Sequence, residues 1–353
     1  MSVDTAPAGD GPRLSDTMRE AASKYGLIAV LLALPVYLAI TDLASDGTLS
    51  TLGNTLVLGL SNGAIFALVA LGYTLVYGII ELINFAHGEV FMIGSFVSFG
   101  LWGNFGLSEG MGVGGLILGL LVCLLLSMIV CGSLNVMIER VAYKPLRNAP
   151  KLAPLITAIG FSFILQNVGV LWLGSSPTSV PDLIDQSNVL VDVGGIQIRN
   201  GDLLAVAVTA PLVFLLTSFI SHSRLGKAMR ATAQDPDAAR LMGINVNTTI
   251  SMTFLLGGML AGAAGLVNLL YQTSVWYFQG FTAGLIAFTA AVMGGIGNLR
   301  GAVLGGLIIG CIQQLSDNRI GAEWTTAVVF AYLVLIMVFR PQGLIGEVTR
   351  EAG

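Results

Sequence analysis

Residues 113–137 read VGGLILGLLVCLLLSMIVCGSLNVM and contain no Asp, Glu, Lys or Arg. A helix needs about 20 consecutive, mostly apolar residues to cross the hydrocarbon core of a bilayer. In a soluble domain, an uncharged run of this length would have to be buried on every side. The stretch therefore predicts a membrane-spanning helix, and the chain on either side of it repeats the pattern.

The composition of the whole chain agrees with this interpretation. Of its 353 residues, 55% are hydrophobic and 10% are charged, whereas a soluble domain carries about 25% charged residues. Soluble enzymes and disordered scaffolds fit these figures poorly. A net charge of -4 without a basic stripe argues against nucleic acid as a partner. The 45 glycines indicate closely packed spans, because small residues let helices approach one another in a bilayer.

The sequence predicts an all-α, polytopic integral membrane protein with about 10 transmembrane helices, and the apolar runs allow 8 to 10. The count depends on residues 72–90, which lie in an almost continuous apolar stretch, and on residues 281–315, which form two short spans or a broken pair. The candidate spans are residues 26–41, 52–72, 83–103, 113–137, 152–174, 203–221, 249–272, 281–294, 301–315 and 324–339.

The basic residues test this topology, because loops rich in Lys and Arg stay in the cytoplasm. With the N-terminus inside, only Arg199 and Arg319 of the 16 Lys and Arg residues fall outside. We therefore expect both termini to be cytoplasmic. The predicted organisation is a disordered cytoplasmic tail (residues 1–25), a transmembrane domain (26–345) with a cytoplasmic loop (222–248), and a second cytoplasmic tail (346–353).

The longest external loop, residues 175–202, is expected to be a short ordered excursion rather than a domain. It carries Asp182, Asp185 and Asp192. These carboxylates either dock a partner by charge complementarity or simply follow from the orientation rule, which is the simpler interpretation.

No catalytic constellation is present, so the chain is not expected to be an enzyme or to hold a metal or cofactor. The two histidines, His87 and His222, are far apart, and there is no phosphate-binding loop, nucleophile elbow or zinc-ligand spacing. Any energy for transport must therefore come from a gradient or from a partner that hydrolyses nucleotide.

The cytoplasmic loop contains a short helix with clear end signals. Asp235 is a good N-cap, Pro236 suits the first helical position and Gly243 suits the helix end. A helix over Pro236–Met242 would place Ala238, Leu241 and Met242 on one face. Such a face fits a groove on another protein, or it rests on the lipid interface.

The segment INFAHGE, residues 83–89, places polar groups inside an apolar stretch. Each charge at membrane depth costs about 2.5 to 3.5 kcal/mol on insertion scales, so such groups face the bundle interior or a watery cavity. Asn84, His87 and Glu89 either line a translocation pathway or fix helix packing, and the sequence favours neither.

The segment GGIGNLRG, residues 294–301, is too flexible and polar for a helix interior. A break in a membrane helix is tolerated where the freed backbone meets protein or water. We expect a cavity-lining break or a cytoplasmic turn, in which Arg300 steadies the turn or contacts a partner. The residues concerned are Gly294, Gly295, Gly297, Asn298, Arg300 and Gly301.

Several motifs resemble a known family. Asp237-Ala238-Ala239, followed after three residues by Gly243, is similar to the EAA loop of ABC importer permeases, with Asp in place of Glu. More specific stretches resemble the branched-chain amino acid ABC transporter permease family, the LivH type, from about residue 52 to the C-terminus. They are YTLVYGIIELINFAHGEVFMIGSFVS (73–98), IERVAYKP (138–145), LITAIGFSFILQ (155–166) and FTAAVMGGIGNLRGAVLGGLIIG (288–310).

The resemblance implies a transmembrane permease subunit of an ABC importer in the bacterial inner membrane. It implies a second homologous permease subunit, two cytoplasmic ABC ATPases, a periplasmic substrate-binding protein and surrounding membrane lipid as partners. It also implies branched-chain amino acids (leucine, isoleucine, valine or related) as substrates. In such a permease, the coupling segment to the ATPase would be Asp235, Pro236, Asp237, Ala238, Ala239, Leu241, Met242 and Gly243.

Three alternatives remain. A same-family permease for urea, amides or other amino acids differs in substrate alone. A gradient-driven secondary transporter should show paired intramembrane carboxylates or a clear inverted repeat, and the sequence reveals no convincing internal symmetry. A channel would not be expected to carry so large a cytoplasmic loop.

Overall fold

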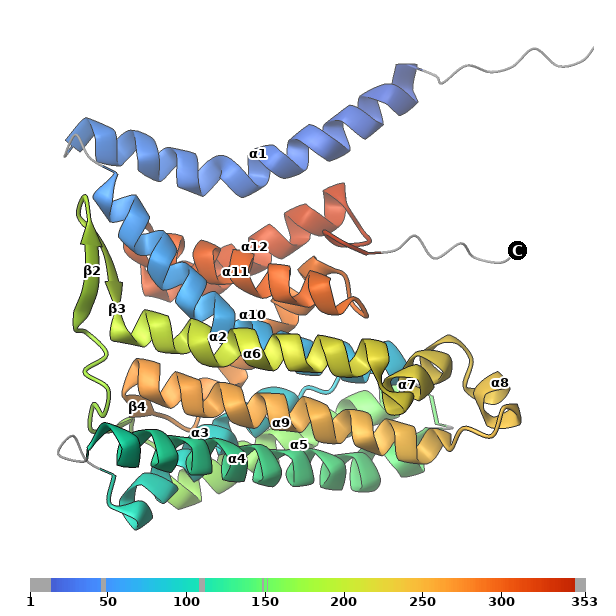
Figure 1. Cartoon of the computed structure of the whole chain (residues 1–353). Coiled ribbons are helices and arrows are strands. Elements are labelled where there is room, and N and C mark those ends of the chain that lie inside the picture. Colours follow the sequence, from blue (N-terminus) through green and yellow to red (C-terminus); the bar gives the residue numbers. More distant parts are fainter. Residues whose placement is uncertain (1–13, 46–48, 108–111, 148, 151, 347–353) are drawn as a thin grey trace, which may run out of the picture.

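The computed structural model describes residues 14–45, 49–107, 112–147, 149–150 and 152–346. Long helices run side by side through a single bundle, and the loops that join them gather at its two ends (Figure 1). One end holds the helices α7 (Arg224–Gln234) and α8 (Pro236–Leu241), and we name it the α8 end. The opposite end holds the hairpin strands β2 (Val189–Val193) and β3 (Ile196–Arg199), and we name it the hairpin end.

The first helix, α1 (Leu14–Ser45), contains Pro35 and lies along the outside of the bundle (Figure 1). It starts earlier than the sequence suggested, because residues 14–25 are helical rather than part of a disordered tail. These residues read LSDTMREAASKY and are rich in good helix formers. The Gly and Pro residues that suggested a tail belong to residues 1–13, which lie outside the described residues.

The first half of the bundle continues with α2 (Ser50–Ile80), α3 (His87–Phe105), α4 (Val113–Ile138) and α5 (Leu152–Leu173). A π-helical turn, Glu139–Tyr143, and a 3₁₀ turn, Lys144–Leu146, extend α4 at the α8 end. The second half consists of α6 (Asn200–His222), α9 (Val246–Gln272), α10 (Gln279–Gly294), α11 (Leu299–Arg319) and α12 (Ala322–Phe339). Each of the ten apolar runs found in the sequence overlaps a described helix, although residues 83–86 of the third run precede α3.

The two halves repeat one packing scheme in opposite directions. In the first half, α4 packs against α9; its counterpart in the second half, α11, packs against α2. Likewise α3 contacts α5, and their counterparts α10 and α12 contact each other. The breaks within the halves also match, because α2 and α9 end at left-handed residues, Glu81 (φ 52°) and Thr273 (φ 47°). The next helix begins six residues later in each half, at His87 and at Gln279. The fold thus contains an inverted repeat that the sequence did not reveal.

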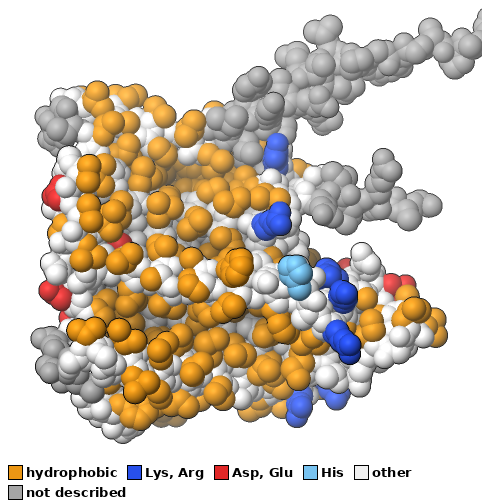
Figure 2. All heavy atoms as spheres, viewed as in Figure 1, with side chains coloured by type: hydrophobic (Ala, Val, Ile, Leu, Met, Phe, Trp, Pro, Cys, Tyr) orange, Lys and Arg blue, Asp and Glu red, His pale blue; other side chains and the backbone are white. Residues whose placement is uncertain are grey.

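Seven described helices are long and apolar enough to cross a membrane: α2, α4 with its extension, α5, α6, α9, α11 and α12. The apolar part of α1 (Leu31–Ala44) and α10 are shorter apolar helices. The central helices α2 and α9 are mostly buried in the bundle, whereas α4, α5, α6 and α12 turn most of their apolar side chains outward. Figure 2 shows this apolar surface across the middle of the molecule. The chain is therefore an all-α polytopic membrane protein.

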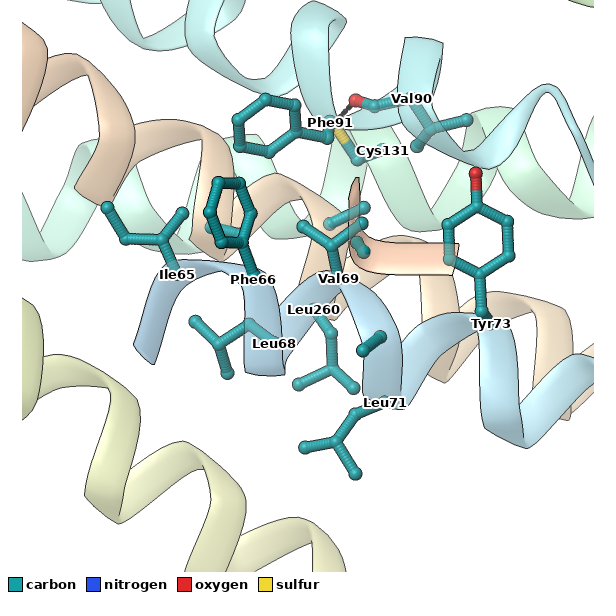
Figure 3. Packing of buried hydrophobic residues seen from close by; sticks show 14 of the residues in the cluster. Ile65, Phe66, Leu68, Val69, Leu71, Tyr73, Val90, Phe91, Cys131 and Leu260 are labelled. Atoms are coloured by element: carbon teal, nitrogen blue, oxygen red, sulfur yellow. Dashed lines mark hydrogen bonds between the residues drawn. The ribbon is translucent and has the colours of Figure 1, made fainter. Parts of the chain in front are cut away.

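The core is centred on α2, whose side chains interdigitate with those of α3, α4 and α9 (Figure 3). Figure 3 shows Phe66 and Val69 of α2 beside Phe91 of α3. Glycines bring the backbones together where α2 crosses α11: a Cβ placed on Gly63 would lie 2.8 Å from the Cα of Leu307. The high glycine content thus serves close helix packing.

The loop between α5 and α6, which the sequence predicted to be external, is ordered. It contains the antiparallel β2–β3 hairpin, joined by Gly194 (φ 63°) and Gly195 (φ 86°), as a tight hairpin turn requires. The short strand β1 (Thr178–Ser179) pairs with β4 (Ser274–Val275). The sequence VLVDVGGIQIR carried the signal for the hairpin, two alternating runs around a Gly-Gly turn.

Candidate functional site

The short helix predicted in the 222–248 loop is present as α8. The carboxylate of Asp235 accepts hydrogen bonds from the backbone N–H groups of Asp237 (2.8 Å) and Ala238 (3.0 Å), and Pro236 fills the first helical position. Gly243 follows the helix at φ 82°, a conformation that favours glycine. The local end signals therefore define a rigid, one- to two-turn helix with fixed boundaries.

The outer face of α8 is apolar and uncovered. Leu241 and Met242 are 90% and 82% exposed, and Ala238 is exposed beside them. Ala239 points the other way and is buried, which fixes the helix against its neighbours. In Figure 1, α8 projects beyond the ends of the long helices, so its apolar face is presented away from the bundle.

Most of the basic side chains in view lie at the α8 end. Figure 2 shows Lys and Arg side chains gathered along this end, with a patch of acidic side chains beside them near α8. Arg224, Lys227 and Arg230 of α7 belong to this group and are exposed. The N-terminal end of α1 and the C-terminal end of α12 lie at the same end (Figure 1).

The three polar residues of the INFAHGE segment are all buried at the start of α3. Asn84 donates to Oδ1 of Asn135 on α4 at 3.1 Å, and the Asn135 amide donates to the Phe254 carbonyl on α9 at 2.7 Å. The hydroxyl of Tyr143 donates to the carbonyl of Ile83 at 3.1 Å. Asn84 therefore belongs to a polar connection between α3, α4 and α9.

His87 and Glu89 occupy separate positions in the interior. The ring of His87 lies edge-on to Tyr73, with centroids 4.8 Å apart, and no hydrogen-bond partner of either ring nitrogen is found among the described residues. Oε1 of Glu89 accepts from Nε2 of Gln166 at 2.9 Å and from Oγ of Ser162 at 3.1 Å. Its Oε2 atom has no partner among the described residues and lies where α3 meets Gly280 of α10.

A second polar cluster, absent from the sequence-based expectations, lies beneath the α8 loop. The buried carboxylate of Glu139 pairs with Arg147 and accepts from Oγ of Ser251 on α9 at 2.7 Å. Arg147 also donates to Oδ1 of Asn247 at 2.6 Å. The cluster ties the start of α9, directly after α8, to the π-helical end of α4. Its signal was the pair of opposite charges around the IERVAYKP motif.

The glycine-rich segment 294–301 is a turn between α10 and α11. Asn298 caps α11 by accepting from the N–H groups of Arg300 (3.0 Å) and Gly301 (3.2 Å), and its amide donates to the Ile345 carbonyl at 2.8 Å. The turn is held by Asn298 and the 343–345 segment, since the Arg300 side chain makes no hydrogen bond or ion pair within the described part of the chain.

This turn also lines a large cavity, which has a volume of about 1290 Å³ and lies between α2, α6, α7 and α11. Arg230, Asn298 and Arg300 lie on its wall. Asn84, His87 and Glu89 do not line it. The structure therefore joins the 294–301 turn to α7 through one cavity and keeps the INFAHGE residues apart from both.

Comparison with known proteins places this geometry in a family. The family model for permease components of branched-chain amino acid transport systems matches residues 55–338. The chain belongs to this family. It is 43% identical to the high-affinity branched-chain amino acid transport system permease protein BraD of Pseudomonas aeruginosa, covering 83% of this chain and 95% of that protein. It is 40% identical to the corresponding protein LivH of Escherichia coli, covering 82% and 94%.

Family membership decides the broad function. The chain is a transport permease and a multi-pass membrane protein. A more distant relative, a probable branched-chain amino acid transport permease protein of Methanocaldococcus jannaschii, is 26% identical over 80% of this chain and 89% of its own length. The motifs at 73–98, 138–145, 155–166 and 288–310 all fall inside the matched range of the family model.

Proposed function

We propose that the permease is the transmembrane subunit of a bacterial inner-membrane importer for leucine, isoleucine, valine or related amino acids, powered by ATP hydrolysis on partner subunits. The names of the relatives support this substrate class. No phosphate-binding loop occurs in the sequence, so hydrolysis would require two separate ATPases. A second permease and a periplasmic binding protein would complete the assembly.

The observation that carries this proposal is the uncovered apolar face of α8. A helix whose ends are fixed by Asp235 and Gly243, and whose exposed residues are Leu241 and Met242, is suited to sit in a groove of a cytoplasmic protein. The Glu139–Arg147 cluster would pass a displacement of α8 to α4, because it contacts the start of α9. Residues 235–243 are thus the proposed coupling segment.

We also propose that the chain has ten spans and that both of its termini lie in the cytoplasm. The gathering of basic side chains at the α8 end supports this orientation. The external acidic loop would then face the periplasm. Its Asp182 accepts from the backbone N–H groups of Ile184 and Gln186, and Asp192 accepts from that of Gly195. These bonds favour a structural role for the carboxylates over a docking role.

For Asn84, His87 and Glu89 we propose a role at the translocation pathway exerted through α5. Glu89 links the start of α3 to Ser162 and Gln166, two buried polar residues of the otherwise outward-facing helix α5. A movement of α5 would therefore be transmitted to the breaks that begin α3 and α10.

The inverted repeat would equally suit a gradient-driven transporter, so the test must separate the two energy sources. The permease is reconstituted in liposomes with its genomic partner subunits, and leucine uptake is measured with ATP inside and then with an imposed ion gradient alone. ATP-dependent uptake supports the proposal, and gradient-driven uptake without ATP contradicts it. Competition by unlabelled isoleucine, urea and glutamate then defines the substrate class.

A further inference from the structure

The large cavity is a groove that the proposed transport role does not explain. On α6 its wall extends from Val206 to Ser221, which corresponds to about 22 Å at 1.5 Å per residue. This length covers most of the hydrocarbon core, which is about 30 Å thick. Its volume of about 1290 Å³ exceeds the usual 300–1,000 Å³ of a small-molecule site. The dimensions suit an elongated molecule better than a compact amino acid.

The wall of the groove changes character along its length. Over most of the bundle it consists of small and aliphatic side chains of α2, α6 and α11, such as Ala67, Ala210 and Leu307. At the α8 end it becomes polar, with Ser218, Ser221 and Asn298 beside Arg230 and Arg300. No Asp or Glu is among its described lining residues.

The two arginines at this end have donors to spare. Arg300 is exposed, and its side chain has no hydrogen-bond or salt-bridge partner among the described residues. Arg230 donates to the carbonyl oxygens of Ile220 and Ser221 at the end of α6, and a guanidinium has five N–H donors. A positively charged mouth, with no carboxylate among its described lining residues, thus opens onto an apolar channel between the long helices.

We propose that this groove binds an anionic phospholipid, with its phosphate at Arg230 and Arg300 and an acyl chain along α6 toward Val206. The planar fork of a guanidinium matches phosphate oxygens, and basic pockets between transmembrane helices hold acidic lipid head groups. The acyl chain accounts for the apolar length of the groove, and the phosphate accounts for the two positive charges at its mouth.

The test measures lipid retention by the full chain, purified in mild detergent with the subunits it retains. Native mass spectrometry counts bound phosphatidylglycerol, added at fixed concentration, with phosphatidylcholine of the same acyl chains as the comparison. Arg300→Gln should lower phosphatidylglycerol retention about fivefold, the ratio for about 1 kcal/mol per basic side chain, and leave phosphatidylcholine unchanged. Ala210→Trp, which narrows the groove away from the arginines, should lower the retention of both lipids.

Arg224→Gln is the matched control, because Arg224 is exposed on α7 but does not line the groove. It should retain wild-type phosphatidylglycerol, and a loss equal to that of Arg300→Gln would reduce the effect to general surface charge and overturn the proposal. Unchanged retention in both Arg300→Gln and Ala210→Trp would also overturn it. If inorganic phosphate displaces phosphatidylglycerol and Ala210→Trp leaves retention unchanged, the groove binds a free anion rather than a lipid, and the proposal is overturned. Arg300 lies on the surface, so its variant remains informative if Ala210→Trp fails to fold.

Discussion

The side chain of Glu89 on α3 is held by Gln166 on α5 through a bond of 2.9 Å between Oε1 and Nε2. Ser162, one turn earlier on α5, donates to the same oxygen at 3.1 Å. α5 otherwise turns most of its side chains outward. Glu89 is thus a buried acid whose bonding partners belong to a peripheral helix, and any movement of α5 changes its environment.

We expect Glu89→Gln to lower amino acid uptake about tenfold, the ratio for about 1.4 kcal/mol. The amide keeps an acceptor oxygen for Gln166 and Ser162 but puts an NH2 group in place of the unpartnered Oε2 atom beside Gly280. Uptake is measured in cells or proteoliposomes at matched amounts of membrane protein. Ser162→Ala is the control, since it removes one donor and leaves Gln166 in place, and its effect should be smaller. Wild-type uptake by Glu89→Gln would leave only a packing role for this carboxylate.

Close contact between α2 and α11 gives a stability prediction. A Cβ on Gly310 would overlap the backbone of Gly63, whereas one on Gly160 would meet nothing within 4 Å. Gly310→Ala should destabilise the permease by about 1 to 3 kcal/mol, the usual cost of overpacking. Gly160→Ala should be neutral or slightly stabilising. The thermal midpoint of the purified protein in detergent measures both, and equal midpoints would refute this account of the glycines.

A buried carboxylate tests how α1 is attached to the bundle. Asp42 is the only buried carboxylate among the described side chains of α1. Asp42 pairs with Arg319 at the end of α11 at 2.6 Å and accepts from the backbone N–H of Leu52 at 2.7 Å. Because Arg319 is one-third exposed, we expect Asp42→Asn to cost about 2 kcal/mol, less than the 3 to 5 kcal/mol for breaking a fully buried pair.

A double-mutant cycle with Arg319→Gln isolates the interaction between these two residues. The combined variant should be little less stable than Asp42→Asn alone, as read from thermal midpoints. Strictly additive losses would show that the two side chains act independently, and α1 would then owe its attachment to other contacts.

The sequence predicted the helices well because apolar runs and helix end signals act locally. Asp235, Pro236 and Gly243 define α8 without help from distant residues, and the structure confirms that helix within one residue of its expected end. Each of the ten apolar runs likewise overlaps a helix, and only the run from residue 83 begins in a break, before α3 starts at His87. A second exception is the start of α1, where the Gly and Pro residues of the tail obscured the helix-forming residues from Leu14 onward.

Contacts between distant segments could not be predicted in the same way. Glu89 and Gln166, or Glu139 and Ser251, meet only after the helices pack, and a single sequence carries no signal for that pairing. The inverted repeat escaped detection because packing conserves the places where α2 and α9 break, Glu81 and Thr273, while the side chains around them differ.

If the exposed face of α8 couples this permease to an ATPase, a charge placed on that face should disrupt the coupling, and Leu241→Glu introduces one. Leu241 is 90% exposed, so the variant should fold and reach the membrane normally. Val191→Glu is the control, because Val191 is an exposed apolar residue of the hairpin end. The measurement is ATP hydrolysis by the reconstituted complex in response to substrate-loaded binding protein. Leu241→Glu is expected to abolish this response and Val191→Glu to retain it; a wild-type response from Leu241→Glu would show that this face of α8 does not couple the permease to an ATPase.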